Sequence, residues 1–310
     1  MKFPFRLPEK RQFDVVGFGT NAVDYLIVVP EYPAFNSKIQ LSGYVQAAGG
    51  EAATTMVGLQ RLGLKTAYLG RFGADEEGAF GLRSLTEEGV DVRFAETIAG
   101  ARTQIAFIVI DERSGERTII WNRDELLAYD EKDAPLDAAA LGKVLHFTPH
   151  DTKACLRMAR AAKENGAIVS IDIDNVFEGV EELLPFVDIL ISAAEFPEKL
   201  VGIKDKKKSL HEIKSRFGCK IVGMTLGAGG SMLLCENEFV ETEGFAVPGD
   251  CKDTTGAGDS FRAGLLYGLL NGETVETSAR MANAVAALKC RALGARTALP
   301  KQLELNDFLK

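Results

Sequence analysis

Residues 167–193 read AIVSIDIDNVFEGVEELLPFVDILISA and hold two short apolar runs, AIVSIDID and DILISA, with a segment of helical periodicity between them. Both runs are apolar at successive positions, which is typical of strands buried on both faces of a sheet. The same alternation extends from FDVVGFG at residues 13–19 to MLLCENEFVETEG at residues 232–244. We therefore predict an α/β fold with a mostly parallel sheet that helices cover on both faces.

Two stretches depart from this alternation, because each holds consecutive strand-like runs with no helical segment between them. They are YLIVVPEYPAFNSKIQLSGYVQAAGG at residues 25–50 and ARTQIAFIVIDERSGERTIIWN at residues 101–122. The sequence DERSG at residues 111–115 has the composition of a hairpin turn. We predict one domain over residues 1–310, with a small β-sheet lid formed by approximately residues 25–48 and 101–122.

The composition excludes several classes of protein. The chain has 310 residues, of which 46% are hydrophobic and 26% charged, with a formal net charge of −8. This balance is too apolar for disorder, and the negative charge disfavours nucleic acid as a partner. No segment resembles a signal peptide or an apolar membrane span. Five scattered cysteines without a C-x-x-C pair indicate neither disulfides nor zinc, so we expect a cytoplasmic protein with no membrane partner.

The segment DTTGAGDSFRAG at residues 253–264 carries the strongest chemical signal. A turn of small residues that opens a helix directs backbone N–H groups and the positive end of the helix dipole at one point, which makes an anion site. Gly256, Ala257 and Gly258 leave room for a phosphate there. Asp259 would repel that phosphate unless it accepted a proton from an attacking hydroxyl, so we predict that it is a general base. A simple helix-capping role is the alternative.

The sequence DTTGAGDSF resembles the C-terminal signature of the PfkB, or ribokinase-like, family, which includes ribokinase, ketohexokinase and adenosine kinase. The likeness implies a ribokinase-like fold, ATP-dependent phosphorylation of a sugar hydroxyl, Asp259 as catalytic base and an anion hole at Gly256, Ala257 and Gly258. It also implies that Asp253 and Thr255 match positions that bind a monovalent cation, such as K⁺, in some members.

The likeness extends over essentially the whole chain, including GRFGADEEGAFGLRSLTEEGVDV at residues 70–92. It implies sugar binding by Asp24, at a strand end, and by the pair Gly49 and Gly50. The family commonly continues this pair to an asparagine, where this chain has Thr54, which offers one hydroxyl in place of an amide. This departure leaves the identity of the sugar open.

The nucleotide side follows from the same resemblance. Glu195, in SAAE at residues 192–195, matches the glutamate of an N-x-x-E motif that organises Mg²⁺-bound water. Thr225, Gly227 and Gly230 resemble the strand end and turn that line the phosphates of ATP, and Asn283 falls in a helix similar to one that lines the adenine pocket. The resemblance therefore implies ATP and Mg²⁺ as cosubstrate and metal.

The substrate prediction has alternatives. The forms GGEAAT and VAALKC look closest to the ketohexokinase and sulfofructose kinase branch, which favours a ketose. Arg102 and Arg123 in the lid could instead bind a phosphate or sulfonate on the sugar, and a nucleoside is a further alternative. Relatives often dimerise through the lid, so the resemblance also implies a homodimer.

Other protein classes fit less well. The sequence GFGTNA at residues 17–22 fits a loose dinucleotide fingerprint, but YLIVV predicts a strand where a dehydrogenase needs a helix. There is no P-loop motif. Pro149 breaks the helix that His146 and His150 would need to bind a metal, so we expect both in a loop. A sensor that binds nucleotide or sugar without catalysis would be expected to lose Asp259, which is present.

Overall fold

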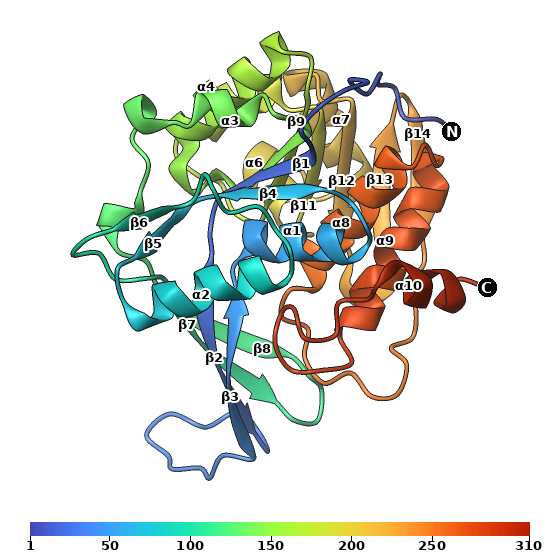
Figure 1. Ribbon diagram of the computed structural model, residues 1–310. Helices are drawn as coiled ribbons and strands as arrows, with labels where there is room; N and C mark the ends of the chain where they lie inside the picture. The colour runs from blue at the N-terminus through green and yellow to red at the C-terminus, as the bar shows by residue number, and fades with distance from the viewer.

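The computed structural model describes residues 1–310 and is built around an eight-stranded main sheet (Figure 1). The order of its strands is β14-β13-β12-β11-β10-β9-β1-β4. Neighbouring strands from β12 to β4 are parallel. The pairs β12–β13 and β13–β14, at one edge, are antiparallel. The strands are β1 (Phe13–Phe18), β4 (Thr66–Leu69), β9 (Gly142–Phe147), β10 (Ile168–Ile173), β11 (Ile189–Ser192), β12 (Ile221–Thr225), β13 (Ser231–Cys235) and β14 (Glu238–Thr242).

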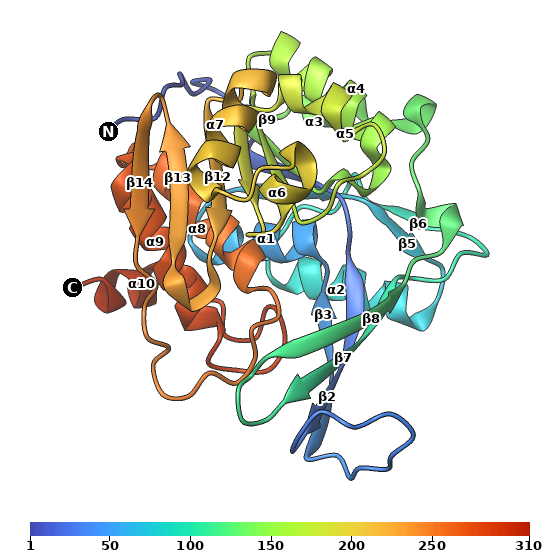
Figure 2. The same cartoon turned by 180° about the vertical axis from the view of Figure 1, so that it is seen from behind.

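Helices cover both faces of this sheet, which confirms the predicted fold class (Figures 1 and 2). One face is covered by α3 (Leu136–Ala139), α4 (Thr152–Glu164), α5 (Val180–Leu183), α6 (Phe196–Val201) and α7 (Lys206–Phe217). The other is covered by α1 (Glu51–Arg61), α8 (Ala257–Leu270) and α9 (Val275–Lys289), with α2 (Glu76–Glu87) and α10 (Gln302–Phe308) nearby. None of the helices is both long and apolar enough to span a membrane.

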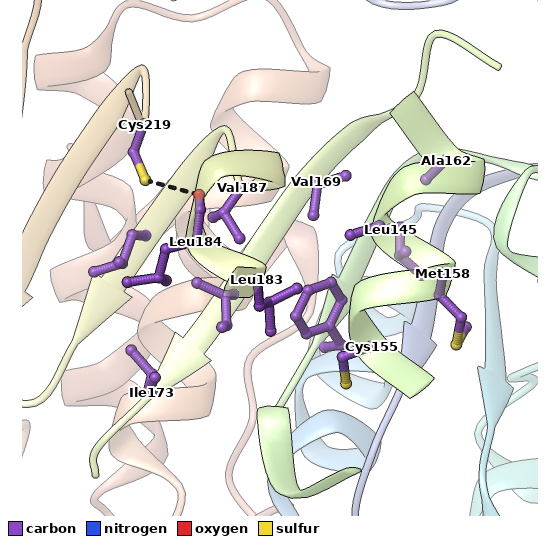
Figure 3. Close-up of a cluster of buried hydrophobic side chains, with 14 of the residues drawn as sticks. Leu145, Cys155, Met158, Ala162, Val169, Ile173, Leu183, Leu184, Val187 and Cys219 are labelled. Carbon is purple, nitrogen blue, oxygen red and sulfur yellow. Dashed lines mark hydrogen bonds between the residues drawn. The ribbon is translucent and has the colours of Figure 1, made fainter. Parts of the chain in front are cut away.

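Alternate residues of the central strands pack into two separate hydrophobic cores, one on each face of the main sheet. Leu145 of β9 and Val169 and Ile173 of β10 pack with Met158 of α4 in one cluster of 34 buried residues, part of which is drawn in Figure 3. In the same view the Cys219 thiol donates to the carbonyl oxygen of Leu184 at 3.6 Å. Because successive side chains of a strand point to opposite faces, the buried polar residues of β9 and β10, which are His146, Ser170 and Asp172, face the other layer.

A four-stranded second sheet lies beside the main sheet, with the order β3-β2-β7-β8 (Figure 2). Its strands are β2 (Ala22–Val29), β3 (Gly43–Gly49), β7 (Ile105–Asp111) and β8 (Arg117–Asn122). The two predicted stretches do supply these strands, and residues 111–117 form the β7–β8 turn. A third, two-stranded sheet pairs β5 (Arg71–Gly73) with β6 (Glu96–Ile98). The chain enters a strand after Gly19, as predicted, and not the helix of a dinucleotide-binding turn.

Candidate active site

The turn before α8 is stabilised by Asp253 and depends on a glycine at residue 256. The Asp253 carboxylate accepts the N–H groups of Thr255 and Gly294, both at 2.8 Å. Gly256 has φ +77°, and a Cβ on it would lie 2.8 Å from the Cβ of Ala295. Any other residue at this position would be strained and would push the turn away from residue 295.

Asp259 lies in the first turn of α8, which begins at Ala257 directly after this turn. The backbone N–H groups of Gly258 and Asp259 donate to no backbone acceptor, as expected for the first turn of a helix. Free donors and the positive end of a helix dipole are the features that an anion site at this turn would need, and the site itself stays a prediction. Burial, followed by the nearby Asp172 carboxylate, raises the pKa of Asp259 well above its usual range.

Asp172 and Arg262 complete the surroundings of Asp259, and neither was predicted from the sequence. Asp172 of β10 lies near Asp259, since its carboxylate charge raises the pKa of Asp259. The Arg262 guanidinium lies 2.6 Å from the Asp172 carboxylate and donates to the carbonyl oxygen of Ile191 at 3.1 Å. A Cβ on Gly258 would lie 2.5 Å from Arg262 Nη1, so this glycine lets the guanidinium pack against the anion-site backbone. The acidic alternation in SIDID, at the end of a buried strand, was the available signal.

Asp24 faces Gly49 across two neighbouring strands of the second sheet. Asp24 lies inside β2, not at a strand end, and is buried. A Cβ on Gly49 would lie 1.9 Å from Asp24 Oδ2, so the absence of a side chain at residue 49 leaves space for this carboxylate. Gly50 has φ +88°, which favours glycine where β3 turns into α1. Burial raises the pKa of Asp24 to about 7, against the opposing charge of Arg296.

Arg296 donates hydrogen bonds to Gly49 and Thr54, which are two of the residues predicted to bind the sugar. Its guanidinium donates to the Thr54 hydroxyl at 3.3 Å, to the Gly49 carbonyl oxygen and to the Ser84 hydroxyl at 2.9 Å. Thr54 is completely buried, so its hydroxyl is used within the protein. Arg296 was not predicted from the sequence.

The two lid arginines differ in their surroundings. Arg123 makes two hydrogen bonds to the Asp151 carboxylate, at 2.9 and 2.7 Å, and a third to the Leu127 carbonyl oxygen. The Arg123 guanidinium therefore forms an ion pair with Asp151. The side chain of Arg102 is exposed.

The second sheet also contacts the turn before α8 directly. Arg117, the first residue of β8, donates to the Thr254 hydroxyl at 2.8 Å. The backbone N–H of Thr254 donates to the Gly115 carbonyl oxygen at 3.3 Å. The β7–β8 turn therefore joins the second sheet to the turn that precedes Asp259.

The predicted nucleotide-side residues follow the ends of strands β11 and β12. Glu195 is exposed and lies between β11 and α6. Thr225 ends β12, and Gly227 opens a short 3₁₀ turn that closes at Gly230, where a Cβ would lie 2.0 Å from the Thr242 carbonyl oxygen. Asn283 of α9 donates to the Thr242 hydroxyl at 2.8 Å. A groove beside these residues is lined by Thr242, Glu243, Gly244, Phe245, Ala246, Glu276, Thr277 and Arg280.

The histidines do not form a metal site. His146 lies in β9 and not in the expected loop, and its ring is completely buried with Nδ1 3.1 Å from the Ser170 hydroxyl of the neighbouring strand. Burial lowers the pKa of His146 to about 3, so the ring is neutral. His150 lies in the 3₁₀ turn Pro149–Asp151. No group of three or more His, Cys, Asp or Glu side chains is arranged to hold a metal ion by itself.

The sequence of the whole chain is similar to those of known kinases. The model of the pfkB family of carbohydrate kinases matches residues 13–302. The Archaeoglobus fulgidus protein named "Uncharacterized sugar kinase" is 33% identical over 258 residues, covering 80% of this chain and 100% of that protein. Probable fructokinase-2 of Arabidopsis thaliana is 31% identical over 324 residues, covering 96% and 95% of the two chains.

Solved structures show the same fold. Arabidopsis thaliana ribokinase complexed with ribose and ATP superposes with a TM-score of 0.82 at 23% identity, covering 96% of this chain and 99% of that one. A fructokinase double mutant from Vibrio cholerae, bound to fructose, ADP and a potassium ion, gives a TM-score of 0.78 at 26% identity, covering 98% and 100%. Kinases of this family are ATP-dependent phosphotransferases, and this chain carries both their sequence pattern and their ribokinase-like α/β fold. The chain therefore belongs to the pfkB family of carbohydrate kinases.

Proposed function

We propose that this enzyme transfers the γ-phosphoryl group of ATP to a hydroxyl of a monosaccharide, with Asp259 as general base. The observation that carries this proposal is the position of the Asp259 carboxyl in the first turn of α8, beside unpaired N–H groups. A raised pKa suits a base that must take a proton from a weakly acidic alcohol. The free N–H groups would stabilise charge on the transferring phosphoryl group.

The sugar would lie between the second sheet and Asp259. Strand register places Ala47, Asp24, Ala106 and Trp121 in one row across the four strands, so their side chains share a face. The Asp24 charge raises the pKa of Asp259, which indicates that the two carboxyls are near each other. We propose that Asp24 accepts hydrogen bonds from sugar hydroxyls and that Gly49 and Gly50 allow the sugar to reach the backbone. Thr54 would act through Arg296.

ATP would approach from the ends of β11 and β12, with its phosphates along Thr225, Gly227 and Gly230 and its base near Asn283. Mg²⁺ would be positioned through water by Glu195, since this ion keeps several waters and bridges phosphate oxygens. The side chain of Glu195 is exposed, which fits such a role. Closure of the second sheet as a lid would exclude water from the reaction.

A ketose is the substrate class that we propose. It is supported by the likeness to Probable fructokinase-2 and to the fructose-bound Vibrio cholerae enzyme. An anionic sugar has weaker support, because the Arg123 guanidinium already pairs with Asp151 and leaves Arg102 as the lid cation with an exposed side chain. A nucleoside finds support in the aromatic contact of Trp121 with His150, whose ring centroids are 6.3 Å apart.

We also propose a cytoplasmic homodimer that forms through the lid. Tyr25 stacks on Tyr44 and Phe107 on the face of the second sheet opposite to Asp24, and Phe107 and Ile120 are exposed there. Exposed apolar surface of this kind is typical of an interface. The five cysteines are unpaired, which suits a reducing compartment.

ATP consumption with Mg²⁺ across a panel of acceptors tests the proposal. The panel would contain fructose, ribose, 2-keto-3-deoxygluconate, adenosine, and phosphorylated and sulfonated ketoses. We expect turnover with a neutral ketose that is lost in Asp259→Asn. Turnover only with adenosine or only with an anionic ketose would overturn the ketose assignment. ATP binding without turnover on any acceptor would contradict the kinase mechanism proposed for Asp259.

A further inference from the structure

A buried lysine lies directly beneath the anion-site turn. Lys289, the last residue of α9, and Asp253 are both completely buried. The Lys289 ammonium donates to the Asp253 carbonyl oxygen at 2.7 Å and lies 3.6 Å from the carboxylate oxygen Oδ2. Burying a charged ammonium is costly unless it is paired, and here the carbonyl oxygen and the carboxylate of Asp253 compensate its charge.

The three oxygens of Asp253 are all engaged within the protein. Oδ1 accepts the N–H of Thr255, Oδ2 accepts the N–H of Gly294, and the carbonyl oxygen accepts Lys289. The resemblance to ribokinase-like enzymes had implied K⁺ at Asp253 and Thr255. The Thr255 hydroxyl is buried without a partner, but one hydroxyl does not replace the several oxygens that substitute for the hydration shell of an alkali ion.

Electrostatics opposes a second cation at this place. Two unit positive charges about 4 Å apart repel by about 4 kcal/mol at an effective dielectric constant of about 20. The Lys289 ammonium already lies at this place, with Nζ 2.7 Å from the Asp253 carbonyl oxygen and 3.6 Å from the carboxylate oxygen Oδ2. The residues of this chain therefore do not fit a bound K⁺, in contrast to the potassium-bound fructokinase from Vibrio cholerae.

We propose that the Lys289 ammonium takes the place of a monovalent cation beneath the anion-site turn, so that this kinase works without potassium. The inference rests on the proposed anion site at Gly256 to Asp259. Lys289 is a positioning residue, because it holds the carbonyl of Asp253 and touches neither substrate. Two further bonds fasten the same turn to the end of α9, since the N–H groups of Lys252 and Asp253 donate to the Cys290 carbonyl oxygen at 2.9 and 3.4 Å.

The test compares wild type, Lys289→Ala and Lys289→Met in tetramethylammonium buffer with added K⁺, NH₄⁺ or Li⁺ at constant ionic strength. The alanine variant opens space for an ion of ammonium size, whereas methionine fills that space without charge. Initial rates use the best acceptor of the sugar panel. Melting temperature is measured in the same buffers and requires no acceptor, so a failure of the proposed reaction is distinguished from a failure of this inference.

For wild type we expect rates and melting temperature that do not respond to K⁺. Loss of the ammonium should lower the rate of Lys289→Ala at least about tenfold in tetramethylammonium, equal to about 1.4 kcal/mol. K⁺ or NH₄⁺, but not Li⁺, should restore that rate and raise the melting temperature. Lys289→Met should lose activity without rescue. Activation of wild type by K⁺ of about tenfold or more would overturn the proposal, as would rescue of the methionine variant. The proposal would also be overturned by a folded Lys289→Ala variant whose rate and melting temperature do not respond to K⁺. If Lys289→Ala does not fold, the response of the wild-type rate and melting temperature to K⁺ tests the proposal.

Discussion

The guanidinium of Arg262 lies 2.6 Å from the carboxylate of Asp172, and this ion pair is placed directly beside Asp259. The first residue comes from the third position after Asp259 in α8, and the second comes from β10, 90 residues earlier in the chain. Asp172 raises the pKa of Asp259, while Arg262 lowers it. Asp172 and Arg262 are therefore two neighbours whose charges act on the pKa of the base in opposite directions.

This opposition predicts a paired change in pH dependence. The acidic limb of kcat/KM for the sugar should lie above the usual aspartate pKa of about 4, because the base must lose its proton before it can accept one. Asp172→Asn removes a negative charge and should shift that limb to lower pH. Arg262→Gln removes a positive charge and should shift it to higher pH, each by roughly one unit.

The check is a pH profile of kcat/KM at saturating Mg²⁺ and ATP, with circular dichroism at each pH to confirm that the variants are folded. Shifts in the same direction for both variants would contradict the opposing effects assigned to the two charges.

The space at Gly49 predicts a selective loss of sugar binding. In Gly49→Ala the new Cβ would meet Asp24 Oδ2 at 1.9 Å and displace the carboxylate. Hydrogen bonds to a charged group contribute about 1.5–3 kcal/mol, so KM for the sugar should rise roughly 10- to 100-fold. ATP affinity should not change. Gly43→Ala, in the same strand, is the control, because its Cβ would have no neighbour nearer than 3.9 Å. Equal effects of the two substitutions on KM would refute the role given to this contact.

The contact of the lid with the anion-site turn predicts a kinetic effect of Arg117→Ala. Loss of the hydrogen bond to Thr254 should weaken lid closure and lower kcat/KM by roughly tenfold, the scale of one charge-assisted hydrogen bond. The melting temperature should stay near that of wild type, since the Arg117 side chain is exposed. Arg113→Ala is the matched control, because Arg113 pairs only with Asp111 in the same turn. Steady-state kinetics on both variants tests this prediction. An unchanged kcat/KM in Arg117→Ala would contradict a role of the Arg117–Thr254 hydrogen bond in lid closure.

The apolar outer face of the lid predicts the oligomeric state. Light scattering should give wild type a mass near twice the 33.5 kDa of the chain. Ile120→Asp places a charge in the proposed interface and should give the monomer mass. Leu303→Asp removes an apolar side chain on α10 that is even more exposed than Ile120 and should leave the dimer intact. A dimer that survives Ile120→Asp would place the interface elsewhere.

Patterns within single segments allowed much of this structure to be predicted. The apolar runs at β10 and β11 have the residues of strands covered on both sides, and the small residues from Gly256 to Gly258 can form a turn that others cannot. Such properties depend on residues that are close in sequence. The α/β class, the second sheet and the position of Asp259 at a helix start were therefore predictable.

Contacts between distant segments were not predictable in the same way. Arg262 and Lys289 lie in apolar helical runs, and nothing near them in sequence identifies Asp172 or Asp253 as their partners. Arg123 was predicted to face the substrate because no local pattern shows that Asp151 takes its guanidinium. The hydroxyl of Thr54 is likewise taken by Arg296, 242 residues away. A long cationic side chain reaches partners that only the folded chain brings near.

The most direct measurement is single-turnover phosphoryl transfer by Asp259→Asn with the best sugar of the panel, beside Asp250→Asn as a control at an exposed carboxylate. We predict that Asp259→Asn binds ATP as wild type does but transfers phosphate roughly 10² to 10⁴ times more slowly, the scale of a lost general base, while Asp250→Asn is unaffected. Transfer by folded Asp259→Asn at a rate near that of wild type would contradict the assignment of Asp259 as the catalytic base.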